Sequence, residues 1–265
     1  MKPIYELKYL LKPSVEKRIQ LNSQVSSVWY KQPCGMEFVT GEDLTLQMRS
    51  LLRLRMKDYP EIFKLISRVS HKVKRVLKLG WITGIDSLEL ICRGALLTSV
   101  NIGSKSCQQS ELFFRQAFLE LQLNIINTSS HSTELPSNSF ALIYSNGSIH
   151  HSPMFPEICN EINRALIPGG QAIIMVYRKP SIMYLQACMG RSIDYHSPVS
   201  LFLKDSEFLS AMSHLRQLYR ENYYFLRPHV RRLGNWISSR IESILGKYYG
   251  ACQLICLEKL LSLPL

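Results

Sequence analysis

Hydrophobic and polar positions from Val76 onward alternate between strand-like and helix-like patterns. Short apolar runs are followed by segments with helical spacing, an alternation typical of βαβ units and a parallel sheet. We therefore predict an α/β domain built on an open, doubly wound sheet. The expected strands are 76–80, 96–102, 123–128, 140–146 and 171–177, and the expected helices between them are 86–93, 105–121 and 154–166.

Several element boundaries follow from local chemistry. The helix over 154–166 is expected to stop at the Pro168-Gly169-Gly170 turn, because proline cannot continue a helix and glycine favours a turn. Further along, a helix over 203–215 is expected to begin with Asp205 or Ser206 as its capping residue. The closing strands, a hairpin-like pair at the sheet edge, are expected at 223–228 and 250–259.

The chain is expected to divide into two regions. Apolar residues over 43–70 have mixed helical spacing interrupted near Pro60, which predicts a helical cap beside the ligand crevice. We therefore assign 1–70 to an N-terminal helical extension and 71–265 to the α/β domain. Within that domain 178–204 lacks clear periodicity, and 178–218 is interpreted as a lid or an acceptor-side insertion.

The stretch VLKLGWITG, from Val76 to Gly84, predicts a strand that enters a glycine-bracketed turn and then a helix. Such a junction brings backbone N–H groups close to a ligand. Ligands of doubly wound sheets lie outside the carboxyl ends of the strands, near the point where strand order reverses. That rule places Gly80, Asn101 and Ser145-Asn146 around one crevice.

Charge is distributed unevenly along the 265 residues. Residues 1–80 have a net charge of +9, 81–176 of −3 and 177–265 of +6, for a total of +12. Basic flanks around a mildly acidic centre fit an anionic substrate, an acidic partner, a lipid headgroup surface or nucleic acid. Solvated helix faces that keep the protein in solution would explain the same charges. A nucleic-acid partner is disfavoured because the chain has no recognised RNA-binding module.

Cysteine usage and hydropathy indicate the compartment. The seven cysteines are odd in number and include no C-x-x-C pair, which argues against a disulfide framework or a zinc site. No apolar run has the length of a transmembrane segment, and the N-terminus has charges throughout. We expect a cytoplasmic protein.

Five motifs in the expected order and spacing resemble those of class I S-adenosylmethionine-dependent methyltransferases, in particular the methyltransferase type 11 group. The motifs are PCGMEFVTGEDL, VLKLGWITGIDSLEL, GALLTSVNIGSKS, LPSNSFALIYSNGSIHHSP and EINRALIPGGQAIIMVYRKPS. The resemblance implies a Rossmann-like sheet of seven strands whose last strand is antiparallel. It also implies S-adenosylmethionine as cofactor, and the residues implied to hold it are Leu79, Gly80, Trp81, Gly84, Asn101, Ile102, Ser145 and Asn146.

The cofactor motifs depart from that family at three positions. Lys78 replaces an acid of the first strand, Ile82 replaces the middle glycine of the loop, and Asn101 replaces an acid that binds the ribose hydroxyls. The change at 101 should cost about 1–2 kcal/mol of cofactor binding, because neutral hydrogen bonds replace charge-assisted ones. Ile82 is more disruptive, since a β-branched side chain resists positive φ and fills ligand space. Cofactor binding is therefore expected to be weakened or lost.

Three residues are candidates for the acceptor side of the site. His150 and His151 follow the fourth strand, where one of them could orient or deprotonate an acceptor. Tyr177 ends the fifth strand and could line the acceptor pocket, although a tyrosine at a strand end is more often explained by packing. No third ligand lies at a useful spacing, so a metal site is not expected.

The leading functional hypothesis is methyl transfer from S-adenosylmethionine to a small-molecule acceptor, with anionic character suggested by the basic flanks. Its main alternative is a catalytically inactive relative that acts as a binding or stabilising partner, which Lys78, Ile82 and Asn101 together favour. A third hypothesis, an RNA-associated protein, depends on the basic flanks alone.

Overall fold

The computed structural model describes residues 3–31, 50, 52–53, 55–57, 59–69, 75–80, 85–102, 107–108, 111, 123–190, 197–223 and 239–261. Eight strands form one sheet at the centre of these residues. They are β1 (Arg75–Leu79), β2 (Leu96–Asn101), β3 (Leu123–Asn127), β4 (Phe140–Asn146), β5 (Leu166–Arg178), β6 (Phe202–Leu203), β7 (Leu215–Tyr223) and β8 (Cys252–Lys259).

The sheet has the strand order β3-β2-β1-β4-β5-β8-β7, with β6 paired to β5 outside this path. Strands β1 to β5 run parallel, whereas β8 is antiparallel to both of its neighbours. The five predicted parallel strands and the antiparallel last strand are therefore confirmed. The two-residue strand β6 makes the total eight instead of seven. Strand order reverses between β1 and β4, which is where a ligand crevice is expected.

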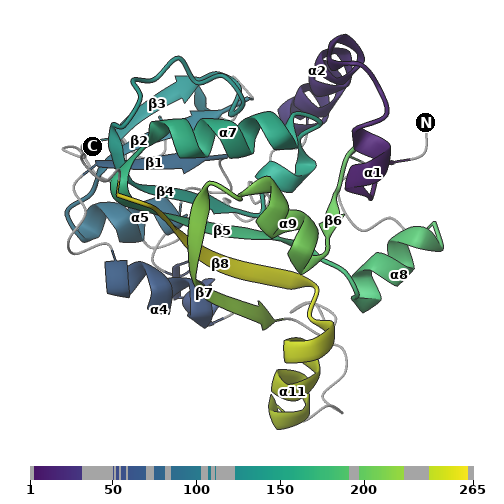
Figure 1. The fold of residues 1–265 in the computed structure, drawn as a ribbon. Helices are drawn as coiled ribbons and strands as arrows, with labels where there is room; N and C mark the ends of the chain where they lie inside the picture. Colours follow the sequence, from purple (N-terminus) through teal and green to yellow (C-terminus); the bar gives the residue numbers. More distant parts are fainter. Residues whose placement is uncertain are drawn as a thin grey trace.

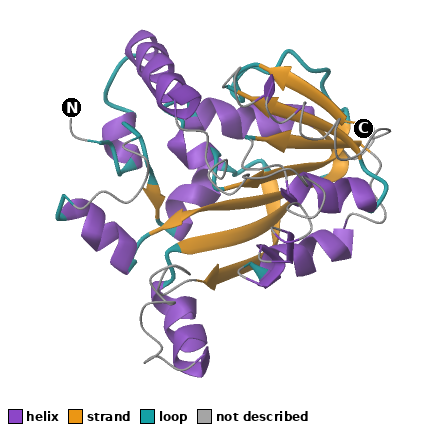
Figure 2. Ribbon diagram, turned by 180° about the vertical axis from the view of Figure 1, so that it is seen from behind, coloured by secondary structure: helices purple, strands orange, loops and turns teal. Residues whose placement is uncertain are grey.

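Helices cover both faces of the sheet (Figures 1 and 2). One core contains residues of α2 (Val15–Lys31), α7 (Phe155–Ala165) and α9 (Asp205–Ala211). The opposite core contains residues of α4 (Pro60–Val69), α5 (Ile85–Cys92) and α8 (Ile182–Cys188). The remaining helices are α1 (Leu7–Leu10), the short 3₁₀ helix η3 (Ile149–His151) and α11 (Ser239–Tyr249). Among the described residues, no helix has the length and apolar character needed to cross a bilayer.

Side chains of the central strands alternate between these two cores. Leu77 and Leu79 of β1 enter the α7 core, and Val76 enters the α4 core, because successive strand residues point to opposite faces. Lys78 falls on the α4 side by the same alternation and is buried. Strand periodicity therefore places a lysine inside the hydrophobic layer.

The N-terminal segment differs from the expected cap. α4 packs as a layer of the sheet, with Ile62, Leu65 and Ile66 buried in its core, since its apolar stripe needs a partner face. Figure 1 shows α1, α2 and α8 beyond the carboxyl ends of the parallel strands. Residues 4–5 hydrogen-bond with 198–202, so the N-terminal segment lies alongside the region before β6.

The helix predicted over 154–166 is confirmed as α7, which ends at Ala165. The Pro168-Gly169-Gly170 turn, however, lies inside β5, where the β4–β5 register shifts. Other predicted boundaries were wrong. The segment expected to be a loop contains α8 and β6. The N-cap of α9 is Lys204, whose N–H donates to Glu207. The strand before β8 is β7, so most of the predicted strand over 223–228 lies outside the described residues.

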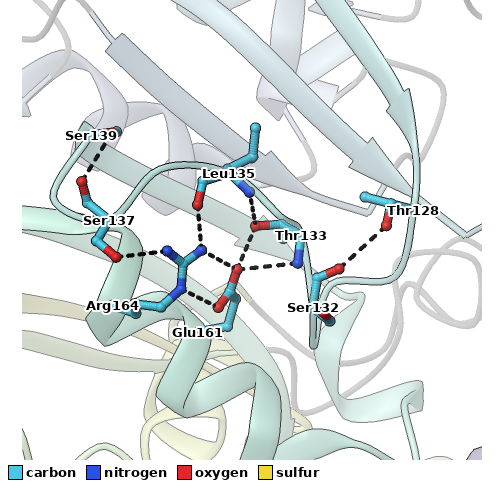
Figure 3. A network of polar contacts seen from close by, with 8 residues as sticks. All are labelled: Thr128, Ser132, Thr133, Leu135, Ser137, Ser139, Glu161 and Arg164. Carbon is cyan, nitrogen blue, oxygen red and sulfur yellow. Dashed lines mark hydrogen bonds and ion pairs between the residues drawn. The ribbon is translucent and has the colours of Figure 1, made fainter.

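The buried carboxylate of Glu161 on α7 hydrogen-bonds to the loop before β4 (Figure 3). Glu161 accepts hydrogen bonds from the backbone N–H (3.2 Å) and the hydroxyl of Thr133 and from Arg164 Nε and Nη2 (both 2.7 Å). Burial opposes ionisation of this carboxyl, but the bonds from Arg164 and Thr133 outweigh it and lower the pKa of Glu161. Arg164 also donates to the Leu135 carbonyl oxygen. The network fixes the path of the chain into β4.

We predict that Glu161→Gln lowers the free energy of unfolding by about 1–3 kcal/mol, because Thr133 and Arg164 lose a charged acceptor. A lowered folded pKa means that this contribution is present above the unfolded pKa of about 4.3 and is lost as pH falls through the folded value. Denaturant unfolding between pH 3 and 7 measures both effects. Ser139→Ala, at an exposed hydroxyl of the same loop, should change stability by less than about 0.5 kcal/mol; an equal loss in both variants would contradict the prediction.

Candidate active site

Gly80, at the carboxyl end of β1, allows two loops to meet. Its φ of 80° is in the left-handed region, and a Cβ there would lie 1.9 Å from Ser148 Oγ. Its N–H donates to the Val100 carbonyl oxygen of β2 (2.8 Å). Only glycine satisfies both the backbone angle and the close approach. The loop after β4 therefore packs directly on the end of β1, a contact the sequence pattern did not reveal.

Asn101 ends β2 beside Gly80 and is 9% exposed. Its carbonyl oxygen accepts from Thr128 N–H (3.1 Å) and from the Cys107 thiol. Both of these contacts involve the backbone of Asn101. The next residue, Ile102, accepts at its carbonyl oxygen from Ser26 Oγ of α2 (3.2 Å). The N-terminal helix thus reaches over the end of β2.

Lys78 does not point its charge at the crevice. Its Nζ donates to Ser87 Oγ of α5 at 2.9 Å and lies 5.9 Å from the centroid of the Tyr144 ring. Burial is the largest influence on this amine and lowers the pKa of Lys78 to about 8. The Lys78 amine therefore turns toward α5, which reduces the repulsion that its positive charge would exert on a cationic cofactor.

Asp86, in the first turn of α5, is the centre of a buried polar cluster. Its Oδ2 accepts from Tyr144 Oη (2.7 Å) and Asn146 Nδ2 (2.9 Å), and its Oδ1 lies 3.4 Å from Arg55 Nε. Burial would raise the pKa of Asp86, but the charges of Arg55 and Lys78 and the two hydrogen bonds lower it to about 2. Asp86 is therefore ionised at neutral pH and joins α5 to the end of β4.

The predicted residues at the end of β4 lie on opposite faces of the strand. Asn146 shares the α4 side with Tyr144, whereas Ser145 faces the α7 side. Ser145 Oγ and Asn146 Oδ1 are both buried without a hydrogen-bond partner. Leu79, a predicted cofactor contact, has its side chain in the core with 1% exposure. Trp81, Ile82 and Gly84 lie outside the described residues.

The three predicted acceptor-side residues lie together. The His150 ring is 4.2 Å from that of His151 and 4.0 Å from that of Tyr177, measured between centroids. Burial, and after it the neighbouring His151, lowers the pKa of His150 well below its usual range, and neither ring nitrogen has a partner. His150 is therefore neutral. His151 Nδ1 lies 3.1 Å from the Val199 carbonyl oxygen and 3.0 Å from Ser200 Oγ.

Aromatic rings from distant parts of the chain surround these histidines. Trp29 of α2 lies edge-on to His151 (5.2 Å), and Phe202 lies 5.4 Å from Tyr177. Arg18 of the same helix donates to both carboxylate oxygens of Glu157 on α7 (2.7 and 2.9 Å). The N-terminal helices therefore form one wall around the acceptor-side residues. Within the described ranges, no group of His, Cys, Asp and Glu is arranged to hold a metal ion.

Sequence reasoning missed Asp86, Arg55 and Ser148. A local signal existed for Asp86, since an acid follows the glycine loop directly in the first turn of the next helix. Arg55 lies far upstream, and only the folded structure brings it to α5. Ser148 could not be identified from the sequence because its role depends on how closely the ends of β1 and β4 approach.

Comparison with known proteins relates the chain to methyltransferases. Residues 77–174 match a family model described as a methyltransferase domain. The ubiquinone biosynthesis O-methyltransferase of Pseudomonas putida (strain W619) is 27% identical over 123 residues, which are 46% of this chain and 53% of that protein. The match therefore spans about half the length of that curated relative.

Solved structures share the fold at low sequence identity. Geranyl diphosphate C-methyltransferase from Streptomyces coelicolor A3(2), in complex with Mg²⁺, geranyl diphosphate and S-adenosyl-L-homocysteine, has a TM-score of 0.63 at 13% identity, covering 91% of this chain and 98% of that one. The [4+2]-cyclase SpnF has a TM-score of 0.57 at 15% identity, covering 98% of each chain. The resemblance to class I S-adenosylmethionine-dependent methyltransferases is thus confirmed, and the chain has their fold.

We predict that His150→Phe keeps or raises the free energy of unfolding, by up to about 1 kcal/mol at pH 7, because it removes two buried polar atoms without partners. A folded pKa far below the unfolded value of about 6.5 means that wild-type stability falls as pH decreases below 6.5. The phenylalanine variant should lose less stability between pH 6.5 and 5. Thermal unfolding across this range measures the difference, with the exposed His214→Gln as control; identical pH slopes for His150→Phe and wild type would refute the prediction.

Proposed function

We propose that the protein is an S-adenosylmethionine-dependent methyltransferase of a small-molecule acceptor. The observation that supports this most is the position of Asn101 and Gly80, side by side at the carboxyl ends of β2 and β1, in a stretch that matches the methyltransferase domain model. The two methyltransferases described above are named for small molecules, ubiquinone and geranyl diphosphate, which supports the same acceptor class.

The residues present fit this cofactor in part. The Asn101 amide offers a donor and an acceptor to the ribose hydroxyls, and Asn146 Oδ1 is an unsatisfied acceptor at the end of β4. Together with the backbone at Gly80, these groups would hold S-adenosylmethionine. When bound, it supplies a methyl group on a cationic sulfur. The contribution of the protein would be to align the reactants and exclude water.

On the acceptor side, His150, His151 and Tyr177 would bind and orient the substrate. The neutral His150 ring retains a free lone pair, so it can accept a proton from an acceptor hydroxyl or orient it. The surrounding rings of Trp29 and Phe202 favour an acceptor with apolar or planar surface. The basic flanks suggest that the acceptor has anionic character.

A second candidate is an inactive relative that binds a partner. The buried cluster of Lys78, Asp86 and Arg55 favours it, because these charges satisfy one another where the family has a cofactor-facing acid. The shared fold of the [4+2]-cyclase SpnF also indicates that the fold alone does not establish methyl transfer.

The test is titration calorimetry with S-adenosylmethionine. We expect measurable binding by the wild type, about tenfold tighter binding by Asn101→Asp, which restores a charged acceptor, and at least tenfold weaker binding by Asn101→Leu. Asn124→Asp, the same change at an exposed position of β3, should leave affinity unchanged. No heat of binding in any variant would refute the enzyme and favour the inactive relative.

A further inference from the structure

The side-chain amide of Asn146 has only one chemically acceptable orientation. Its Nδ2 lies 2.9 Å from Asp86 Oδ2, and that carboxyl, with a pKa of about 2, accepts but cannot donate. A flipped amide would place two oxygens against each other. Asp86 therefore dictates that Nδ2 points toward α5 and that Oδ1 points elsewhere.

Asn146 Oδ1 consequently remains a buried acceptor without a partner. Asn146 as a whole is 5% exposed, so water does not solvate it freely. Buried polar atoms are almost always paired, and an unpaired one is costly enough to require explanation. The unpaired position of Oδ1 follows from the bond to Asp86, because that bond uses Nδ2, the only donor group of the Asn146 amide.

The unpaired Asn146 Oδ1 lies at the point where the sheet is expected to bind its ligand. Asn146 is the last residue of β4, adjacent to β1, and strand order reverses between these two strands. Gly80 ends β1 and contacts Ser148, two residues beyond Asn146. An acceptor without a partner at this place can be satisfied by a donor group of a bound ligand. With the ribose hydroxyls assigned to Asn101, the donors that S-adenosylmethionine has left are its N–H groups.

We propose that Asp86 is a positioning residue, which holds the Asn146 amide so that Oδ1 accepts a hydrogen bond from an N–H group of the bound cofactor. The inference rests on the proposed function and specifies one contact of that site. S-adenosylmethionine has two such groups, the ammonium of its amino-acid part and the exocyclic amine of its adenine. Asp86 acts through Asn146 and does not touch the cofactor.

Two variants test the contact by calorimetry with S-adenosylhomocysteine, which has both groups, and with methylthioadenosine, which lacks the amino-acid part. Asn146→Leu removes Oδ1. Asp86→Asn lets the new amide donate to Asn146, so that the Asn146 amide can turn and satisfy Oδ1 internally. We expect both variants to bind S-adenosylhomocysteine at least tenfold more weakly than wild type.

Tyr144→Phe is the matched control. It removes the other hydrogen bond to the same Asp86 oxygen (2.7 Å) but leaves the Asn146 amide in place. It should lower the melting temperature and keep cofactor affinity within about twofold, whereas a purely structural role of the cluster would reduce affinity in all three variants. If Asp86→Asn fails to fold because Arg55 loses its partner, Asn146→Leu still tests the contact.

Loss of affinity in Asn146→Leu together with full affinity in a folded Asp86→Asn would overturn the positioning role of Asp86. Loss of affinity for S-adenosylhomocysteine alone identifies the ammonium as the donor, and loss for both ligands identifies the adenine amine. Unchanged affinity for both ligands in Asn146→Leu overturns the inference while the proposed function stands. Equal losses in Tyr144→Phe also overturn the inference. A wild-type protein that binds neither ligand overturns the proposed function and the inference with it.

Discussion

The buried carboxylate of Asp86 joins α5 to the end of β4, one of the two strands between which the sheet reverses its order. It receives hydrogen bonds from Tyr144 and Asn146 of β4, and Arg55 and Lys78 supply compensating charge. A buried charge is tolerated only when it is paired and hydrogen-bonded, and Asp86 has both kinds of partner. Its bond to Asn146 fixes the side-chain amide at the end of β4.

The acceptor side follows a different principle. The rings of His151 and Tyr177 pack against His150, whose two nitrogens lack partners, and Trp29 and Phe202 pack against those two rings in turn. Burial keeps this imidazole neutral, whereas the charges of Arg55 and Lys78 and two hydrogen bonds keep Asp86 ionised.

The pattern of apolar runs was sufficient for the parallel strands and for most helices between them, because strand and helix periodicity are local properties. Boundaries that depend on tertiary contacts were less predictable. Pro168-Gly169-Gly170 resembles a helix stop, yet it lies within β5, between the residues that pair with Phe140 and Leu142 of β4. The sequence predicted α4 as part of a helical cap, but its apolar residues pack against one face of the sheet.

For the site, the sequence by itself determined which residues end the strands, and so it identified Gly80, Asn101, Asn146 and the two histidines. It also revealed the departures at Lys78 and Ile82. Only the tertiary structure decided what those residues do with their polar atoms. Lys78 donates to Ser87 of the following helix, Asn146 donates to Asp86 from 60 residues earlier, and the ring nitrogens of His150 are buried without a partner. Hydrogen bonding, burial and pKa depend on such three-dimensional neighbours rather than on sequence order.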